Sequence, residues 1–290
     1  MKLKQKGFTL IELLVSITIL VFILIGVYSL FDQGQWLYLH SEKRANIQDM
    51  ARLAIEGLER DLRMVGNGVP TAYGIGGGGS SWVPFIFSAG KSFIHFRGDV
   101  DSRNTRPRSD TSANPVLVHD AQLICENPYL VGSIPLVIVN DRRTWAGRDC
   151  SSFDAGTNSV TLSAVVSCPP AECEIYTIEH VFYRLTGDAD SDGVCDSTTY
   201  PFCNIEKLEK YGNTPITIGG LGVNDTFSLF ATNVTELSFR YFTASGTETT
   251  SGNFAQKIRV TLTLRDRSSR PQQYQDVTLG TEVVVRDILY

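Results

Sequence analysis

A short acidic segment holds the densest group of potential metal ligands in the chain. Its residues are Asp188, Asp190, Asp192 and Asp196, with Gly193 and Val194 between the last two. Carboxylates at this spacing can converge on one hard cation, and the glycine permits the sharp turn that they require. With the Val194 carbonyl as a further ligand, the segment predicts a calcium site. Thr199 stands where a calcium loop would end in a bidentate glutamate, so an acidic surface turn is the alternative.

The cysteines offer a second kind of chemistry. They are Cys125, Cys150, Cys168, Cys173, Cys195 and Cys203. A zinc site would need closely spaced ligands, but the sequence has no C-x-x-C and only His180 near the cluster. An even number of cysteines favours disulfides in an oxidising compartment. Because short loops close easily, pairing along the chain predicts Cys125–Cys150, Cys168–Cys173 and Cys195–Cys203.

Glu12 is the only charge in an apolar run from Phe8 to Phe31. The run is long enough to cross a bilayer as a helix. A carboxylate there is costly unless it is paired, so Glu12 is a functional candidate. Cleavage between Gly7 and Phe8 would create an α-amino group four residues before Glu12. That amine could meet the carboxylate within one chain or across two neighbouring chains.

A secretory signal peptide and a plain signal anchor both fit the N-terminus less well. A signal peptide would have a shorter apolar core and a small-residue cleavage site after it. A plain signal anchor accounts for every feature except Glu12. The lysines at positions 2, 4 and 6 should keep the leader in the cytoplasm, which sends the rest of the chain across the membrane.

The heptapeptide Gly7-Phe8-Thr9-Leu10-Ile11-Glu12-Leu13 resembles the class III leader of type IV pilins and type II secretion pseudopilins. The resemblance implies cleavage after Gly7 by the prepilin peptidase and N-methylation of Phe8. It also implies that Glu12 acts in assembly between membrane-embedded subunits. The partners implied are other major and minor pilins, the prepilin peptidase and the inner-membrane assembly machinery.

Beyond the apolar run, a helical pattern continues to a glycine-rich stop. Apolar residues from Ile47 to Val65 recur at three- and four-residue spacing, and Gly66, Gly68 and Pro70 follow. We expect a helix from Phe8 to about Val65, with glycines 26, 34 and 57 as weak points. The segment Arg60–Gly66 resembles the helix end of the PilW group of minor pilins and of the pseudopilin GspJ. The same residues also fit a solvated face with i,i+3 and i,i+4 charge pairs.

The rest of the chain has the pattern of a β-rich domain. Alternating or continuous apolar runs predict strands at 93–96, 116–118, 136–139, 160–162, 181–185, 234–242, 258–264 and 277–285. Asn233–Tyr241 resembles the C-terminal sheet of the PilW group. The fold class expected is α+β and pilin-like, a long helix packed on an antiparallel sheet. The predicted parts are a leader (1–7), a transmembrane half-helix (8–31), an extracytoplasmic half-helix (32–66) and a β-rich globular domain (67–290).

Charge and motif content narrow the function. The net charge is −5, without the basic excess typical of nucleic-acid binders, and no nucleophile–base pairing points to an enzyme. With the leader, this predicts a minor pilin that helps initiate or stabilise a type IV pilus, a role compatible with a place near its tip. Two alternatives stay open, a pseudopilin of the GspJ kind and a calcium-dependent adhesin module on a pilin anchor. The location expected is the bacterial inner membrane, in a single pass with an extracytoplasmic globular domain, then the pilus or cell surface.

Overall fold

The structure is a computed structural model of the chain. It describes residues 9–67, 86–100, 104–108, 114–125, 136–140, 145–162, 170, 173–177, 179–199, 201–211, 227–250, 255–267 and 274–285. The chain divides into two compact units, one made of residues 1–49 and 266–275 and the other of residues 50–265 and 276–290.

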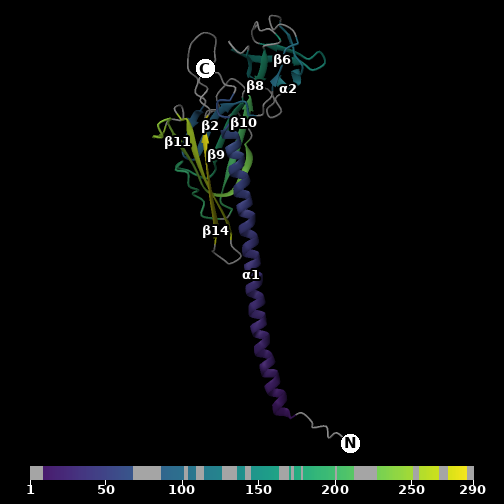
Figure 1. The fold of residues 1–290 in the computed structure, drawn as a ribbon, viewed down its shortest axis with the longest axis vertical. Helices are drawn as coiled ribbons and strands as arrows, with labels where there is room; N and C mark the ends of the chain where they lie inside the picture. Colours follow the sequence, from purple (N-terminus) through teal and green to yellow (C-terminus); the bar gives the residue numbers. More distant parts are fainter. Residues whose placement is uncertain are drawn as a thin grey trace. The chain divides into compact units, whose positions relative to one another are not determined.

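The N-terminal element is one continuous helix, α1 (Leu10–Leu62), of 53 residues (Figure 1). At 1.5 Å per residue it is about 80 Å long. It runs without interruption through Gly26, Gly34 and Gly57, which we expected to weaken it. In the first unit, Trp36 stacks on His40 with ring centroids 5.0 Å apart, and the His40 Nδ1 lies 2.7 Å from the Gln275 Nε2.

The helix ends in a turn at the predicted glycine stop. Gly66 has a φ of 74°, which L side chains rarely adopt. Its N–H leaves the helix and donates to the carbonyl of Arg97 at 2.8 Å. The helix end is therefore fixed by a tight turn and by a strand that follows much later in the sequence.

The larger of two sheets is antiparallel and contains both ends of the globular sequence. Its strands follow the order β1-β2-β9-β10-β11-β13-β14, with β12 paired to β11. The bounds are β1 (Ile86–Ala89), β2 (Phe93–Gly98), β9 (Glu179–Leu185), β10 (Cys203–Tyr211), β11 (Ser228–Phe242), β12 (Glu248–Thr249), β13 (Lys257–Arg267) and β14 (Tyr274–Val284). Alternation places one face in the core: Ile258, Val260, Leu262 and Leu264 of β13 are all fully buried.

The second half of α1 covers this sheet, as the amphipathic pattern predicts. Ala51, Leu58 and Leu62 are fully buried, whereas Leu53 on another face of the helix is 71% exposed. A Cβ on Gly57 would lie 2.9 Å from the Phe230 ring, so the glycine lets β11 approach the helix closely. The observed fold is the predicted α+β, pilin-like arrangement of a long helix on an antiparallel sheet.

A smaller sheet forms between β2 and β9. Its strands follow the order β3-β8-β5-β6-β7-β4, and a short helix packs on it. The bounds are β3 (Asn104–Thr105), β4 (Val116–Leu117), α2 (Ala121–Cys125), β5 (Leu136–Asn140), β6 (Trp145–Asp154), β7 (Ser159–Leu162) and β8 (Glu174–Thr177). In Figure 1 the labelled elements α2, β6 and β8 form a group of their own.

Each strand that the sequence predicted has a counterpart, and several observed strands were not predicted. The predicted runs correspond to β2, β4, β5, β7, β9, β11, β13 and β14. The strand β10 was not predicted because its lysines and glutamates hide the apolar positions. Cys203, Ile205 and Leu208 are nevertheless buried there. β10 is a central strand, since it pairs with both β9 and β11.

Candidate functional site

The structure places Glu12 in the first turn of α1, directly after Leu10 and Ile11. Its Oε2 accepts hydrogen bonds from the Thr9 backbone N–H (3.0 Å) and hydroxyl (2.9 Å), while the Thr9 hydroxyl accepts from the Glu12 N–H at 3.4 Å. This reciprocal arrangement is a capping box. Gly7 and Phe8 lie outside the described residues. Thr9 directly follows Phe8, the predicted new N-terminal residue. The Glu12 carboxylate is therefore bonded to the residue next to the predicted N-terminus.

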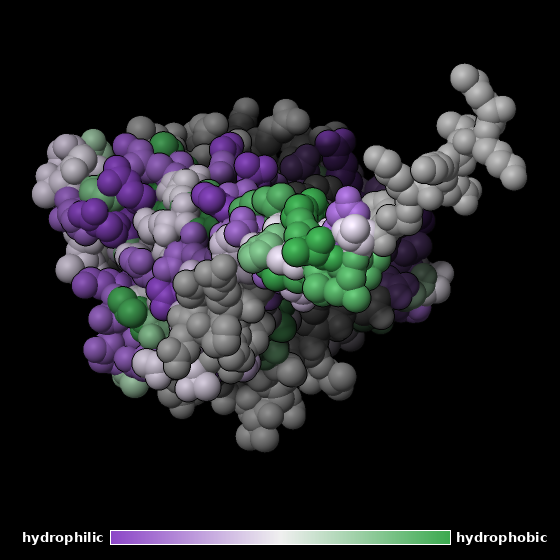
Figure 2. All heavy atoms as spheres, turned by 90° about the horizontal axis from the view of Figure 1, so that it is seen from below, coloured by the Kyte–Doolittle hydropathy of each residue, from purple (hydrophilic) through white to green (hydrophobic). Residues whose placement is uncertain are grey.

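The apolar half of α1 has its side chains on the surface. Leu10, Phe22 and Tyr28 are 77%, 71% and 75% exposed. Figure 2 shows hydrophobic residues gathered in one area, while hydrophilic residues predominate over much of the remaining coloured surface. The described chain has one helix that is long and apolar enough to cross a membrane, and it is α1. Exposed apolar side chains on this scale need a bilayer or protein neighbours.

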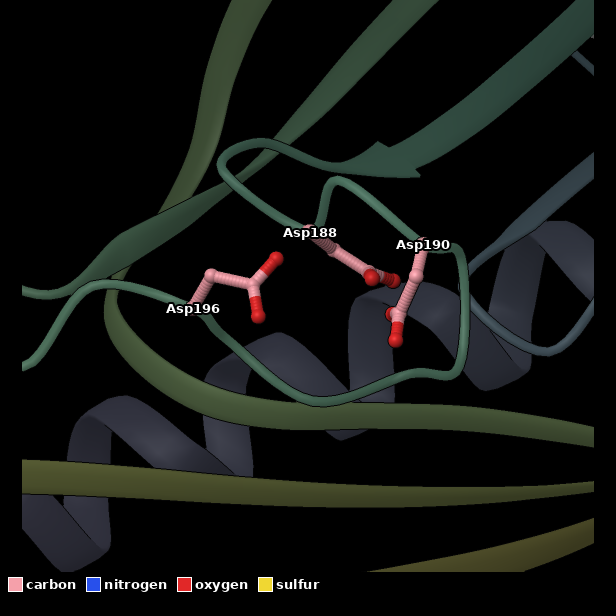
Figure 3. A group of neighbouring side chains, drawn as sticks. All are labelled: Asp188, Asp190 and Asp196. Carbon is pink, nitrogen blue, oxygen red and sulfur yellow. The ribbon is translucent and has the colours of Figure 1, made fainter.

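The acidic loop brings together part of the predicted ligand set. One oxygen from each of Asp188, Asp190 and Asp196 lies within 4.8 Å of the others. Figure 3 shows these three carboxylates turned toward the inside of the loop. Asp192 is not in that group, and its Oδ1 accepts a hydrogen bond from the Val194 N–H at 2.7 Å. The convergence of hard oxygen donors suits a divalent cation.

Backbone groups already contact these carboxylates. Asp188 accepts from the N–H groups of Asp192 (3.2 Å) and Gly193 (3.1 Å), and Asp196 accepts from Ala189 at 2.6 Å. Such bonds offset part of the repulsion between neighbouring carboxylates. Hydrogen bonds within the loop thus contribute to its shape.

Strand β11 anchors the loop on one side. The Leu237 N–H donates to the Gly193 carbonyl, and the Cys195 N–H donates to the Thr235 carbonyl, both at 2.9 Å. Val194 lies between them and forms an antiparallel bridge with Glu236, so its own N–H and carbonyl point away from β11. Gly193 has a φ of 93°, and a Cβ there would lie 2.8 Å from the Leu237 carbonyl. Glycine is thus required on both conformational and steric grounds.

The structure joins Cys125 to Cys150 and Cys195 to Cys203, as pairing along the chain predicts. Cys173 is also in a disulfide. Cys168 lies outside the described residues, so the pair Cys168–Cys173 stays a prediction. The Cys195–Cys203 bond closes the end of the acidic loop onto the start of β10.

A buried charge cluster that the sequence did not predict joins α1 to the sheet. Asp61 is fully buried, and its Oδ2 accepts from the Tyr183 hydroxyl at 2.5 Å and from the Lys207 Nζ at 2.7 Å. The Lys207 Nζ is also 2.8 Å from a Glu209 oxygen. The solvated-face interpretation is therefore wrong for Asp61. It holds for the exposed Arg63, which forms an i,i+4 ion pair with Glu59. Glu59 itself is half-buried and also accepts a hydrogen bond from the Thr281 hydroxyl of β14 at 2.8 Å.

The cluster shifts the pKa of two of its members. Burial raises the pKa of Tyr183, and the neighbouring Asp61 carboxylate raises it further. Burial alone would lower the pKa of Lys207, but hydrogen bonds to Asp61 and Glu209 outweigh it, so the pKa is raised. The sequence held one signal for this site, since Asp61 falls three residues after Leu58 and so lies on the apolar stripe of the helix.

A comparison with known protein families gives a match at the N-terminus of the chain. Residues 2–28 match the family model described as the prokaryotic N-terminal methylation motif. No curated protein and no solved structure matches the chain.

The chain thus carries a class III leader and is a type IV pilin-like protein. The leader indicates a structural subunit of the pilin or pseudopilin type, processed by the prepilin peptidase and assembled in the membrane with other pilins. The long apolar helix agrees with membrane anchoring and with display on a pilus or on the cell surface.

Proposed function

We propose that this chain is a minor pilin that helps initiate or stabilise a type IV pilus. The observation that carries the proposal is the union of the class III leader with α1, which is apolar and exposed in its first half and sheet-covered in its second. Such a helix can leave a bilayer and pack among the helices of neighbouring subunits without unfolding the domain that it carries.

In the proposed assembly the negative charge of Glu12 pairs with a positive charge, and we call this requirement the charge rule. Thr9 satisfies part of the hydrogen-bonding capacity of the carboxylate, but it supplies no positive charge. A charge in the membrane favours pairing with an opposite charge. The N-methylated amine of Phe8, on the same or a neighbouring subunit, is the partner that we propose.

Processing is tested on protein extracted from the membrane of a strain with an active prepilin peptidase. Intact-mass measurement and N-terminal sequencing should give a chain that begins at Phe8 and carries one added methyl group. A strain without the peptidase is the control and should retain Met1. Recovery of Met1 in the active strain would contradict the proposed processing.

The choice between a pilus and a secretion pseudopilus is tested by deleting the gene. A minor pilin should be needed for normal numbers of surface pili, and a tagged copy should be found in sheared filaments. Unchanged piliation together with a loss of protein secretion would assign the chain to the pseudopilin alternative.

We also propose that the acidic loop binds calcium. The support is the convergence of the Asp188, Asp190 and Asp196 carboxylates, with the Val194 carbonyl not used in pairing with β11. A cation that binds only the folded loop would raise stability by mass action, by about 2.7 kcal/mol at one hundred times the dissociation constant. Such a site would also support the adhesin alternative.

The test is thermal unfolding of the full chain in detergent, with disulfides oxidised, in calcium, magnesium or chelator. Calcium should raise the melting temperature more than magnesium, which prefers a stricter octahedron. Asp190→Asn should abolish the shift, whereas Glu56→Gln on the exposed face of α1 should keep it. Equal melting temperatures in calcium and chelator would leave the loop as an acidic turn.

A further inference from the structure

We infer that residues 99–178 form a separate module, inserted into a hairpin of the larger sheet and carried by it. We call these residues the insert and the rest of the globular domain the platform. The inference rests on the path of the chain, on the contacts at its two crossing points and on the core of the insert.

The two crossing points are neighbours in one β ladder. β2 pairs with β9 in antiparallel register, and its last pair joins Gly98 to Glu179. The chain therefore leaves the platform at one residue and returns at its direct partner. A two-residue hairpin turn could close the same ladder, so the platform needs none of the intervening sequence to form its strands.

We call the residues around Gly98 and Glu179, where the chain leaves and re-enters the platform, the neck of the insert. Glu179 connects its two strands. It is fully buried, and its Oε2 accepts from the Val100 N–H at 2.7 Å while its Oε1 accepts from the Thr177 hydroxyl at 2.9 Å. One platform carboxylate thus holds the outgoing and the returning strand. Both bonds help to satisfy a buried charge.

The insert has a hydrophobic core made of its own residues. The cluster comprises Val116, Val118, Ala121, Cys125, Cys150, Val160, Leu162, Cys173 and Ile175. The disulfide Cys125–Cys150 ties α2 to β6 inside it. The Asn114 side chain accepts from the Leu162 N–H and donates to its carbonyl, at 3.0 and 2.8 Å, which adds a further internal link. A region with its own sheet, core and covalent bridge meets the structural conditions for a cooperative unit.

The neck lies against the residues that end α1. The Asp99 N–H donates to the Asn67 carbonyl at 2.9 Å, and a Cβ on Gly98 would lie 2.0 Å from the Met64 carbonyl. The insert is thus attached beside the turn that ends α1. Given the proposed function, on which this step rests, the platform performs assembly and the insert is free to make recognition contacts.

Hydrogen exchange on the full chain tests whether the insert is a unit. Val160→Asp places a charge in the core of the insert, and Ile94→Asp does so in the core of the platform; both positions are fully buried. Val160→Asp should lower protection in α2 and β4–β8 by at least about tenfold and leave β9–β11 within about twofold. Ile94→Asp should lower protection in β2 and β9–β11. Loss of protection in β9–β11 with Val160→Asp would overturn the inference.

An excision variant tests the same point without a core charge. Residues 101–176 are replaced by Asn-Gly, which keeps Val100, Thr177 and both of their bonds to Glu179. The platform strands β9–β11 should keep their exchange protection, and a second variant with a longer Gly-Ser linker guards against a strained turn. Loss of platform protection in both variants would overturn the inference.

Assembly is scored separately, so that the two proposals can fail independently. The excised chain should enter filaments like the full chain. If the full chain assembles and a folded excised chain does not, the division of roles between platform and insert is wrong. If neither assembles, the proposed pilin function fails, while hydrogen exchange still decides whether the insert is a module.

Discussion

The helix α1 carries two carboxylates in apolar surroundings, Glu12 in its exposed apolar half and Asp61 in its sheet-covered half. Asp61 is fully buried and bonded to Tyr183 and Lys207 of the same chain. Glu12 has Thr9 as its hydrogen-bond donor and is on the surface.

The two carboxylates differ in whether their charge is paired within the described part of the chain. A buried charge whose partners belong to the same chain stabilises one arrangement of that chain, because removing a partner leaves an uncompensated charge. Glu12 has no cationic partner among the described residues, and the partner proposed for it is the Phe8 amine of the same or a neighbouring chain. Asp61 thus contributes to the fold, whereas the role proposed for Glu12 is in assembly.

The largest effect should come from Asp61→Ala. It leaves the Lys207 ammonium and the Tyr183 hydroxyl without their shared acceptor, so the free energy of unfolding should fall by about 3 kcal/mol or more. Denaturant unfolding in detergent measures it. Glu56→Ala is the matched control, because Glu56 is exposed on α1 and its loss should cost about 0.5 kcal/mol or less. Similar losses of unfolding free energy for both variants would show that the buried contacts of Asp61 do not account for its effect.

Substitutions at Gly57 and Gly34 test whether the two halves of α1 differ in packing. Gly57→Leu should cost about 1–3 kcal/mol, because its Cβ would already lie 2.9 Å from the Phe230 ring. Nothing lies within 4 Å of a Cβ on Gly34, so Gly34→Leu should leave the unfolding free energy unchanged or raise it through helix propensity. The same measurement applies, and an equal loss at Gly34 would show that this part of α1 is also covered.

The buried cluster should make the fold sensitive to alkali. The raised pKa values of Tyr183 and Lys207 mean that their contribution to stability is fully present below their ordinary values of 10.0 and 10.5. It is lost as the pH rises through the raised values of the folded protein. Unfolding measured from neutral pH to about pH 12 should show this fall, and Lys207→Met should reduce its slope. An unchanged slope would show that Lys207 does not contribute to the loss of stability at alkaline pH.

The smallest effect on folding should come from Glu12→Ala. It removes a helix cap far along the sequence from the sheet, so unfolding of the globular domain should change by less than about 0.5 kcal/mol. Filament assembly should nevertheless fall. Glu12→Gln keeps a hydrogen-bond acceptor without the charge and should fail equally, whereas Thr9→Val keeps the charge and should assemble. Normal filaments with Glu12→Gln would contradict the charge rule.

Patterns that depend on neighbours in the sequence were predictable. The leader motif, the helix, its glycine stop and strands with one clean apolar face follow from local periodicity and turn chemistry. The strand β10 escaped because Glu206, Lys207 and Glu209 interrupt its apolar positions. In the structure Glu206 pairs with Arg184 at 2.7 Å on β9, so a neighbouring strand supplies what the sequence pattern lacks.

The sequence by itself determined the N-terminal motif, a helix with an apolar first half and a β-rich remainder, because each of these is written in residues close together along the chain. The tertiary structure decided how the buried Asp61 is paired, since two of its partners, Tyr183 and Lys207, lie more than one hundred residues away along the chain. It also decided that residues 99–178 are an insert, because that conclusion depends on Gly98 and Glu179 being register partners. Long-range pairing of this kind leaves no local pattern from which it could be predicted.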